Sequence, residues 1–129
     1  MAEELILQDR RDAVTLLTLH RPDKRNALSL ALRDALSERI ATLEADQETK
    51  VIVVTGAGKA FSAGFDLAEV GNRDPDFVRQ SEQSSARYHA RLSNCALPVI
   101  CAINGVAVAG GLDLAVMCDI RIASPQARF

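Results

Sequence analysis

The sequence lacks a strong net charge and a long apolar run, and each absence excludes a class of protein. Its 129 residues carry a net charge of -2, which argues against a nucleic-acid-binding surface because such surfaces need a basic patch. No apolar run is long enough to span a bilayer, and the acidic start is unlike the basic start of a signal peptide. We therefore expect no nucleic-acid partner and no membrane partner.

Cysteine is also scarce, and its pattern excludes a disulfide framework. Cys95, Cys101 and Cys118 are odd in number and lack the spacing of metal ligands. We therefore expect reduced thiols, no metal site and a cytoplasmic location. Cys101 and Cys118 are expected to be small buried residues. Repeats and low-complexity segments are absent as well, and an apolar content of 48% is enough for the core of one domain.

Apolar patterning predicts an α/β fold. The first strands are expected at 5–7 and 14–19, joined by a polar turn at 8–12. A helix with Ser29 as its N-cap is expected next, with Arg33 on its polar face. Strands alternating with helices are typical of an α/β domain. Further strands are expected at 51–55, 99–103 and 119–123, and further helices at 65–70, 77–92 and 111–118.

Two glycine-bearing segments each follow an apolar strand and precede a helix. They are residues 59–67, KAFSAGFDL, and residues 104–115, NGVAVAGGLDLA. Two strand-to-helix corners of this kind can direct two backbone N–H groups at one point, where fixed donors stabilise an oxyanion as its charge develops. The glycines also have a structural explanation, namely a tight turn capped by Asp66 in the first segment and close packing of a helix on a strand in the second.

The run at 56–59, GAGK, does not fit a nucleotide-binding loop. A P-loop would have glycine where Val53 stands and Ser or Thr where Ala60 stands. A dinucleotide-binding loop would have its third glycine where Phe61 stands. We therefore interpret this run as a tight turn.

Four segments together resemble the enoyl-CoA hydratase/isomerase, or crotonase, superfamily. Besides the two glycine segments they are residues 20–28, in which HRP is followed by KRNAL, and residues 117–123, MCDIRIA. The resemblance runs in family order along the whole chain and implies a crotonase-like spiral of ββα units. Family members are much longer, so residues 1–129 are expected to be the N-terminal part of a single acyl-CoA-binding domain, truncated before its C-terminal helices.

The resemblance implies catalytic roles for Phe65, Gly110 and Asp113. The N–H of Phe65, after Gly64, and the N–H of Gly110 would hold the thioester carbonyl oxygen as the α-carbon takes on enolate character. Asp113 occupies the position at which hydratases carry the first of two glutamates, whereas dienoyl-CoA isomerases carry Asp there. Asp113 is therefore expected to act as an acid–base or orienting carboxylate, with its shorter side chain favouring isomerisation over hydration. The alternative is that it only interacts with the N-terminus of its helix.

The remaining matched residues are expected to contact the CoA part of the substrate. Lys24 and Arg25 resemble the stretch beside the nucleotide and could meet phosphate oxygens; a solvated basic turn is the alternative. Ala63, Asp66 and Leu67 resemble the loop along the adenine and pantetheine. The expected substrate-binding residues are Lys24, Arg25, Ala27, Ala63, Gly64, Phe65, Asp66, Leu67 and Gly110.

Neither histidine is expected to take part in chemistry. His20 is expected to be structural and His89 to be solvated on its helix. The second acid–base residue of the family would lie beyond Phe129.

The resemblance implies an enoyl-CoA hydratase or an enoyl- or dienoyl-CoA isomerase of fatty acid metabolism. Coenzyme A would enter as part of the substrate, with no separate cofactor, and the full-length protein would be a homo-oligomer, a trimer or a hexamer. Two alternatives remain: a non-catalytic acyl-CoA-binding or assembly protein on the same fold, and a fragment that is inactive by truncation.

Overall fold

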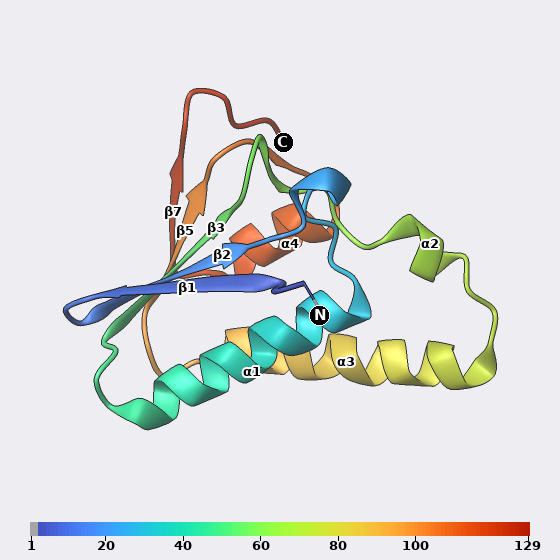
Figure 1. Ribbon diagram of the computed structural model, residues 1–129, viewed down its shortest axis with the longest axis horizontal. Coiled ribbons are helices and arrows are strands. Elements are labelled where there is room, and N and C mark those ends of the chain that lie inside the picture. The colour runs from blue at the N-terminus through green and yellow to red at the C-terminus, as the bar shows by residue number, and fades with distance from the viewer. Residues whose placement is uncertain (1–2) are drawn as a thin grey trace.

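Three strand–strand–helix units follow one another along the chain (Figure 1). The computed structural model describes residues 3–129, and no helix in that part is both long and apolar enough to cross a membrane. The elements are, in chain order, β1 (Ile6–Arg11), β2 (Val14–Leu19), the short 3-10 helix η1 (Pro22–Lys24), α1 (Leu30–Asp46), β3 (Val51–Gly56), β4 (Ala60–Ser62), α2 (Leu67–Val70), α3 (Pro75–Ser93), β5 (Val99–Ile103), β6 (Val106–Ala107), α4 (Gly110–Met117) and β7 (Ile120–Ala123).

Five strands form one sheet in the order β1-β2-β3-β5-β7, and β4 and β6 form a second, two-stranded sheet. Only β1 runs antiparallel to its neighbour; the other pairs of the large sheet are parallel. Parallel strands end at the same edge of a sheet, so the segments that follow Leu19, Gly56 and Ile103 leave the sheet on one side. These segments contain the residues predicted to form the site.

The core lies between the large sheet and the helices. Helices α1 and α3 pack against each other (Figure 1), and α1 buries Leu32, Leu36 and Ile40 at the spacing that the sequence predicted. The strands contribute alternate residues, such as Leu17 and Leu19 of β2. Each fully buried side chain of this kind stabilises the fold by about 1.5–3 kcal/mol. Cys101 and Cys118 are free and buried, as predicted.

Several element boundaries differ from the expected ones by one or two residues, and two of the differences have a clear physical reason. The turn expected at 8–12 is wrong, because β1 continues to Arg11 and the hairpin turns at Asp12, which has a φ of 55°. This strand lies at the edge of the sheet and its outer residues face solvent, so polar side chains do not end it. Helix α3 begins at Pro75, because Asp74 caps its N-terminus.

Arg33 is buried, contrary to the expectation that it lies on the polar face of its helix. Its side chain is covered because α3 packs over α1, and its guanidinium donates to the carbonyl oxygen of Leu28 at 2.7 Å and to the hydroxyl of Ser81 at 2.9 Å. It also lies 4.9 Å from the centre of the Phe65 ring. Burial lowers the pKa of Arg33 despite nearby acidic groups. Arg33 therefore joins α1, α3 and the loop that carries Phe65.

Candidate functional site

The two glycine segments meet at the edge of the sheet where the parallel strands end. They are brought together by β4 and β6, which pair in parallel and lead into them. A Cβ placed on Gly64 would lie 3.1 Å from the nitrogen of Gly110, and one placed on Gly110 would lie 3.4 Å from the nitrogen of Phe65. The backbone amides of Phe65 and Gly110 are therefore neighbours in space.

Both of these amides are free to bind a ligand. Within residues 3–129, neither the N–H of Phe65 nor that of Gly110 donates a hydrogen bond to a protein atom. The amides beside them are occupied, because Gly64 N–H donates to the Ser62 hydroxyl at 3.3 Å and Gly111 N–H donates to the Val108 carbonyl at 2.9 Å. Gly110 is the first residue of α4, and the first N–H groups of a helix have no partner within it. An oxygen atom that accepts from both amides would complete the arrangement.

Ala109 makes the sharp turn that presents Gly110. Its φ of 49° and ψ of -125° are close to those of a position that usually requires glycine. Such strain costs about 1–3 kcal/mol and is concentrated at functional sites. Helix α4 begins at the next residue without a side-chain cap, so the positive end of its dipole lies at the site.

The adjacent glycines Gly110 and Gly111 have different reasons for being glycine. A Cβ on Gly111 would lie 2.0 Å from the carbonyl oxygen of Ser62, so α4 can approach β4 only if that residue is glycine. A Cβ on Gly110 would meet no atom closer than 3.4 Å. Close packing of the helix on the strand therefore explains Gly111 but does not explain Gly110.

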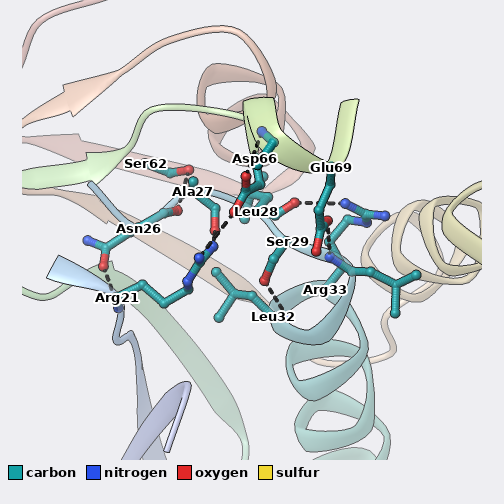
Figure 2. Close-up of polar contacts among 12 residues, drawn as sticks. Arg21, Asn26, Ala27, Leu28, Ser29, Leu32, Arg33, Ser62, Asp66 and Glu69 are labelled. Atoms are coloured by element: carbon teal, nitrogen blue, oxygen red, sulfur yellow. Dashed lines mark hydrogen bonds and ion pairs between the residues drawn. The ribbon is translucent and has the colours of Figure 1, made fainter. Parts of the chain in front are cut away.

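A polar network holds the early KRNAL segment against the first glycine segment (Figure 2). Arg21 donates to the carbonyl oxygen of Ala27 at 2.9 Å and to Asp66 at 3.1 Å. Buried Asn26 accepts a hydrogen bond from the Arg21 amide, and the hydroxyl of Ser62 donates to its carbonyl oxygen, both at 2.9 Å. Sequence reasoning assigned no function to Arg21 or Asn26, although both stand in matched motifs.

The carboxylate of Asp66, which was expected to contact substrate, is engaged by protein groups. It accepts the N–H of Ala68 at 3.0 Å, which caps α2, and forms an ion pair with Arg21. Burial opposes ionisation, but the hydrogen bonds from Arg21 and from Ala68 outweigh it, so the pKa of Asp66 is lowered. In this structure Asp66 orients the loop of Phe65 and faces the cavity described next.

A cavity of about 530 Å³ lies beside the two amides, within the size range of small-molecule sites. A smaller cavity of about 290 Å³ shares Phe65, Asp66 and Val70 with it and extends towards Phe77 and Val78. The structure thus brings together seven of the nine expected substrate-binding residues, while Gly64 and Gly110 lie next to lining residues in the chain. The larger cavity is lined by Lys24, Arg25, Ala27, Ala63, Phe65, Asp66, Leu67, Ala68, Val70 and Ala109.

Lys24 and Arg25 are exposed at this cavity. Neither forms an ion pair with another residue of the described part of the chain. Both side chains are therefore available to an anion such as a phosphate group.

Asp113 lies on α4, one turn after Gly110, and contacts a histidine. Its Oδ2 atom is 3.0 Å from Nε2 of His89 on α3, and His89 Nδ1 is 2.7 Å from the carbonyl oxygen of Ser85. Partial burial lowers the pKa of His89, but the hydrogen bonds with Asp113 and Ser85 outweigh it, so the pKa is raised. The side chain of His89 is 39% exposed, so it is solvated only in part. Its contact with Asp113 was not expected, and nothing in its local sequence signals it.

Known proteins resemble this chain over almost all of its length. A family profile described as enoyl-CoA hydratase/isomerase matches residues 9–129. A probable enoyl-CoA hydratase of Mycobacterium tuberculosis is 41% identical over 90% of this chain and 45% of its own length. The 2,3-dehydroadipyl-CoA hydratase of Escherichia coli is 38% identical over 98% of this chain and 48% of its own.

Solved structures agree with the sequence comparisons. An enoyl-CoA hydratase of Mycobacterium smegmatis superimposes with a TM-score of 0.89 at 36% identity, over 97% of this chain and 49% of that one. The observed α/β fold is therefore the one that the sequence resemblance implied. The chain spans about half the length of the curated relatives it matches.

Proposed function

The chain belongs to the enoyl-CoA hydratase/isomerase family, and on that premise we propose that it is part of an acyl-CoA enzyme that stabilises a thioester enolate. The observation that carries this proposal is the pair of neighbouring, unpaired amides at Phe65 and Gly110. They lie beside a cavity with two exposed cations, Lys24 and Arg25. This combination suits a ligand that has an acceptor oxygen at one end and phosphates at the other.

The two amides would act as an oxyanion hole. As the α-carbon of an acyl-CoA takes on enolate character, negative charge moves to the thioester oxygen, and hydrogen bonds from Phe65 and Gly110 strengthen. Loss of one such donor costs about 2.7–4 kcal/mol in known enzymes. The donors are main-chain groups fixed by β4, β6 and α4, so they need not reorganise during the reaction.

Asp113 would transfer the proton, and the reaction would be enoyl-CoA hydration or double-bond isomerisation. Hydration adds the hydroxyl of water to the β-carbon and a proton to the α-carbon, whereas isomerisation removes a proton from one carbon and returns it to another. The relatives reported above are named as hydratases. The short side chain of Asp113 favours isomerisation, because a displaced carboxylate would misplace the attacking water.

The proposal also covers CoA binding, the cofactor requirement, the location and the oligomeric state of the whole protein. The phosphates of CoA would meet Lys24 and Arg25, no separate cofactor would be needed, and the enzyme would be a cytoplasmic homo-oligomer, a trimer or a hexamer. The smaller cavity, with its apolar side chains of Val70, Phe77 and Val78, would take the acyl chain.

A non-catalytic acyl-CoA-binding protein is the second candidate, and one observation favours it. The side chain of Asp113 is 52% exposed and lines neither of the two cavities described above. A binding protein would need the amides and the cavity but not this carboxylate.

Binding and turnover, measured separately, distinguish these candidates. We would titrate the protein calorimetrically with a 2-enoyl-CoA and with free CoA, and follow hydration and double-bond migration chromatographically. Turnover that disappears in Asp113→Asn while binding persists supports the enzyme. Binding without turnover in the native chain is expected both of a binding protein and of a fragment that is inactive by truncation, and a turnover assay of the full-length protein separates these two. If neither thioester nor free CoA binds, the proposal is wrong.

A further inference from the structure

One proton of His89 is fixed by the helix on which the residue stands. Its Nδ1 atom lies 2.7 Å from the carbonyl oxygen of Ser85, one turn earlier on α3. A carbonyl oxygen only accepts hydrogen bonds, so Nδ1 carries a hydrogen and donates it. The protonation of His89 can therefore change only at Nε2.

Nε2 faces a second group that accepts hydrogen bonds. It lies 3.0 Å from Oδ2 of Asp113 on α4. A neutral ring that is protonated at Nδ1 has a lone pair at Nε2, and this lone pair would face an ionised carboxylate. The short contact is favourable only with a proton between the two atoms. The pair is then either imidazolium and carboxylate, or neutral imidazole and carboxylic acid, and each form contains one shared proton.

We propose that His89 is a positioning residue that acts through Asp113 and holds the proton that the thioester enolate receives on carbon. This inference rests on the function proposed above. It gives Asp113 a partner within the described chain, on α3, in addition to the acid–base residue expected beyond Phe129.

The proton transfer is balanced in both candidate reactions. The O–H bond of Asp113 breaks, a C–H bond forms from the electron pair of the enolate, and the thioester carbonyl is restored. In hydration the enolate forms as the oxygen of water adds to the β-carbon, and the proton that this water releases restores the pair afterwards. In isomerisation the carboxylate of Asp113, beside the imidazolium of His89, takes the proton from the other carbon as the enolate forms and then returns it. Neither reaction needs an oxidant or a reductant.

The surroundings of the ring favour retention of this proton. Arg33 of α1, a positive charge, and partial burial both oppose protonation of His89. Asp113 of α4 and the Ser85 carbonyl favour it, and they prevail, so the pKa of His89 is raised above its ordinary value of about 6.5. Tyr88 lies edge-on to the ring at 5.1 Å and stays neutral, because burial raises its pKa further. His89 thus stays protonated until the pH rises through this raised pKa.

A titration of the chain by nuclear magnetic resonance tests the pair without reference to activity. The chain has two histidines, and the signal lost in His89→Gln identifies His89. We expect the pKa of His89 to exceed 6.5 and to fall in Asp113→Asn, because this change removes the opposite charge beside the ring. A pKa of His89 that Asp113→Asn leaves unchanged would overturn the proposal.

The pH dependence of turnover tests the role of the pair in catalysis. Glutamine at 89 can still donate a hydrogen bond to Asp113 but has no proton to release. We expect native kcat to decline as the pH rises through the pKa of His89, and we expect His89→Gln to lose this decline and about tenfold in kcat, with KM nearly unchanged. If kcat of His89→Gln declines with rising pH as native kcat does, His89 does not hold the transferred proton.

Calorimetric titration with acyl-CoA distinguishes failure of the proposed function from failure of the role of His89. If no acyl-CoA binds, the proposed function fails, whatever His89 does. If acyl-CoA binds and is turned over but the profile of His89→Gln matches the native one, only the role of His89 fails. If acyl-CoA binds but the full-length protein does not turn it over, the role of His89 in proton transfer is wrong, even if the titration of His89 depends on Asp113.

Discussion

Replacing Gly111 by alanine should damage both the fold and the site. The added Cβ would lie 2.0 Å from the carbonyl oxygen of Ser62, whereas real Cβ atoms essentially never come within 3.0 Å of such a neighbour. Ser62 cannot retreat, because it is fully buried, its hydroxyl donates to Asn26 at 2.9 Å and its carbonyl accepts the amide of Val108. Helix α4 must therefore withdraw from β4.

Two opposing effects determine how far Gly111→Ala changes the free energy of unfolding. Overpacking costs about 1–3 kcal/mol or more, while alanine gains at most about 1 kcal/mol over glycine in helix propensity. We expect the free energy of unfolding to fall by about 2 kcal/mol. The withdrawal also moves the amide of Gly110, and a misplacement of about 1 Å can lower turnover by about 10²-fold.

Urea unfolding followed by circular dichroism, together with calorimetric titration of a 2-enoyl-CoA, measures both effects. Gly71→Ala is the matched control, because its added Cβ would meet nothing closer than 3.6 Å; its stability should change by no more than about 0.5 kcal/mol. In Gly110→Ala the added Cβ would meet nothing closer than 3.4 Å, so its urea midpoint should also equal that of the native chain. If Gly111→Ala matches Gly71→Ala in stability and binds acyl-CoA like the native chain, the packing argument is wrong.

Three further predictions concern neighbouring residues. Ala109→Gly should raise the free energy of unfolding by about 1 kcal/mol, since relief of about 1–3 kcal/mol of backbone strain exceeds the entropic cost of glycine; lower stability in urea would contradict the strain. Gly110→Pro removes the second donor and should cut turnover by at least about 10²-fold; a folded variant, checked by circular dichroism, with near-native turnover would count against the oxyanion hole. Because the pKa of Asp66 is lowered, its stabilising contribution is present above its unfolded pKa of about 3.9 and lost as the pH falls through the folded value. The stability difference between the native chain and Asp66→Asn should therefore narrow below about pH 4, and a constant difference in urea midpoints would refute this.

The features predicted from sequence are those that depend on local pattern. The apolar period of α1 and its Ser29 cap are confirmed, since the Ser29 hydroxyl accepts the amide of Leu32 at 3.2 Å. The buried strands at 51–55 and 99–103 are confirmed as well. The roles of Phe65 and Gly110 as donors stay predictions, although the structure brings their amides together.

The features that sequence reasoning missed depend on contacts between distant segments. Strands β4 and β6 are too short to show an alternation of their own, and they exist because they pair with each other. Arg33 is buried because α3 covers it. His89 meets Asp113 only because α3 and α4 lie side by side, and no pattern within either helix indicates this contact.

Because the donors are main-chain groups, protein engineering can change the acyl-group preference without removing the oxyanion donors. Any residue except proline offers the same amide, so the identity of the side chain at Phe65 does not decide whether a donor exists. The side chain of Phe65 and that of Val70, at the end of α2, are 36% and 59% exposed. A library randomised at Phe65 and Val70, which line the smaller cavity, should therefore yield variants with altered acyl-group preference on an unchanged electrostatic framework. These two positions are the place to begin directed evolution.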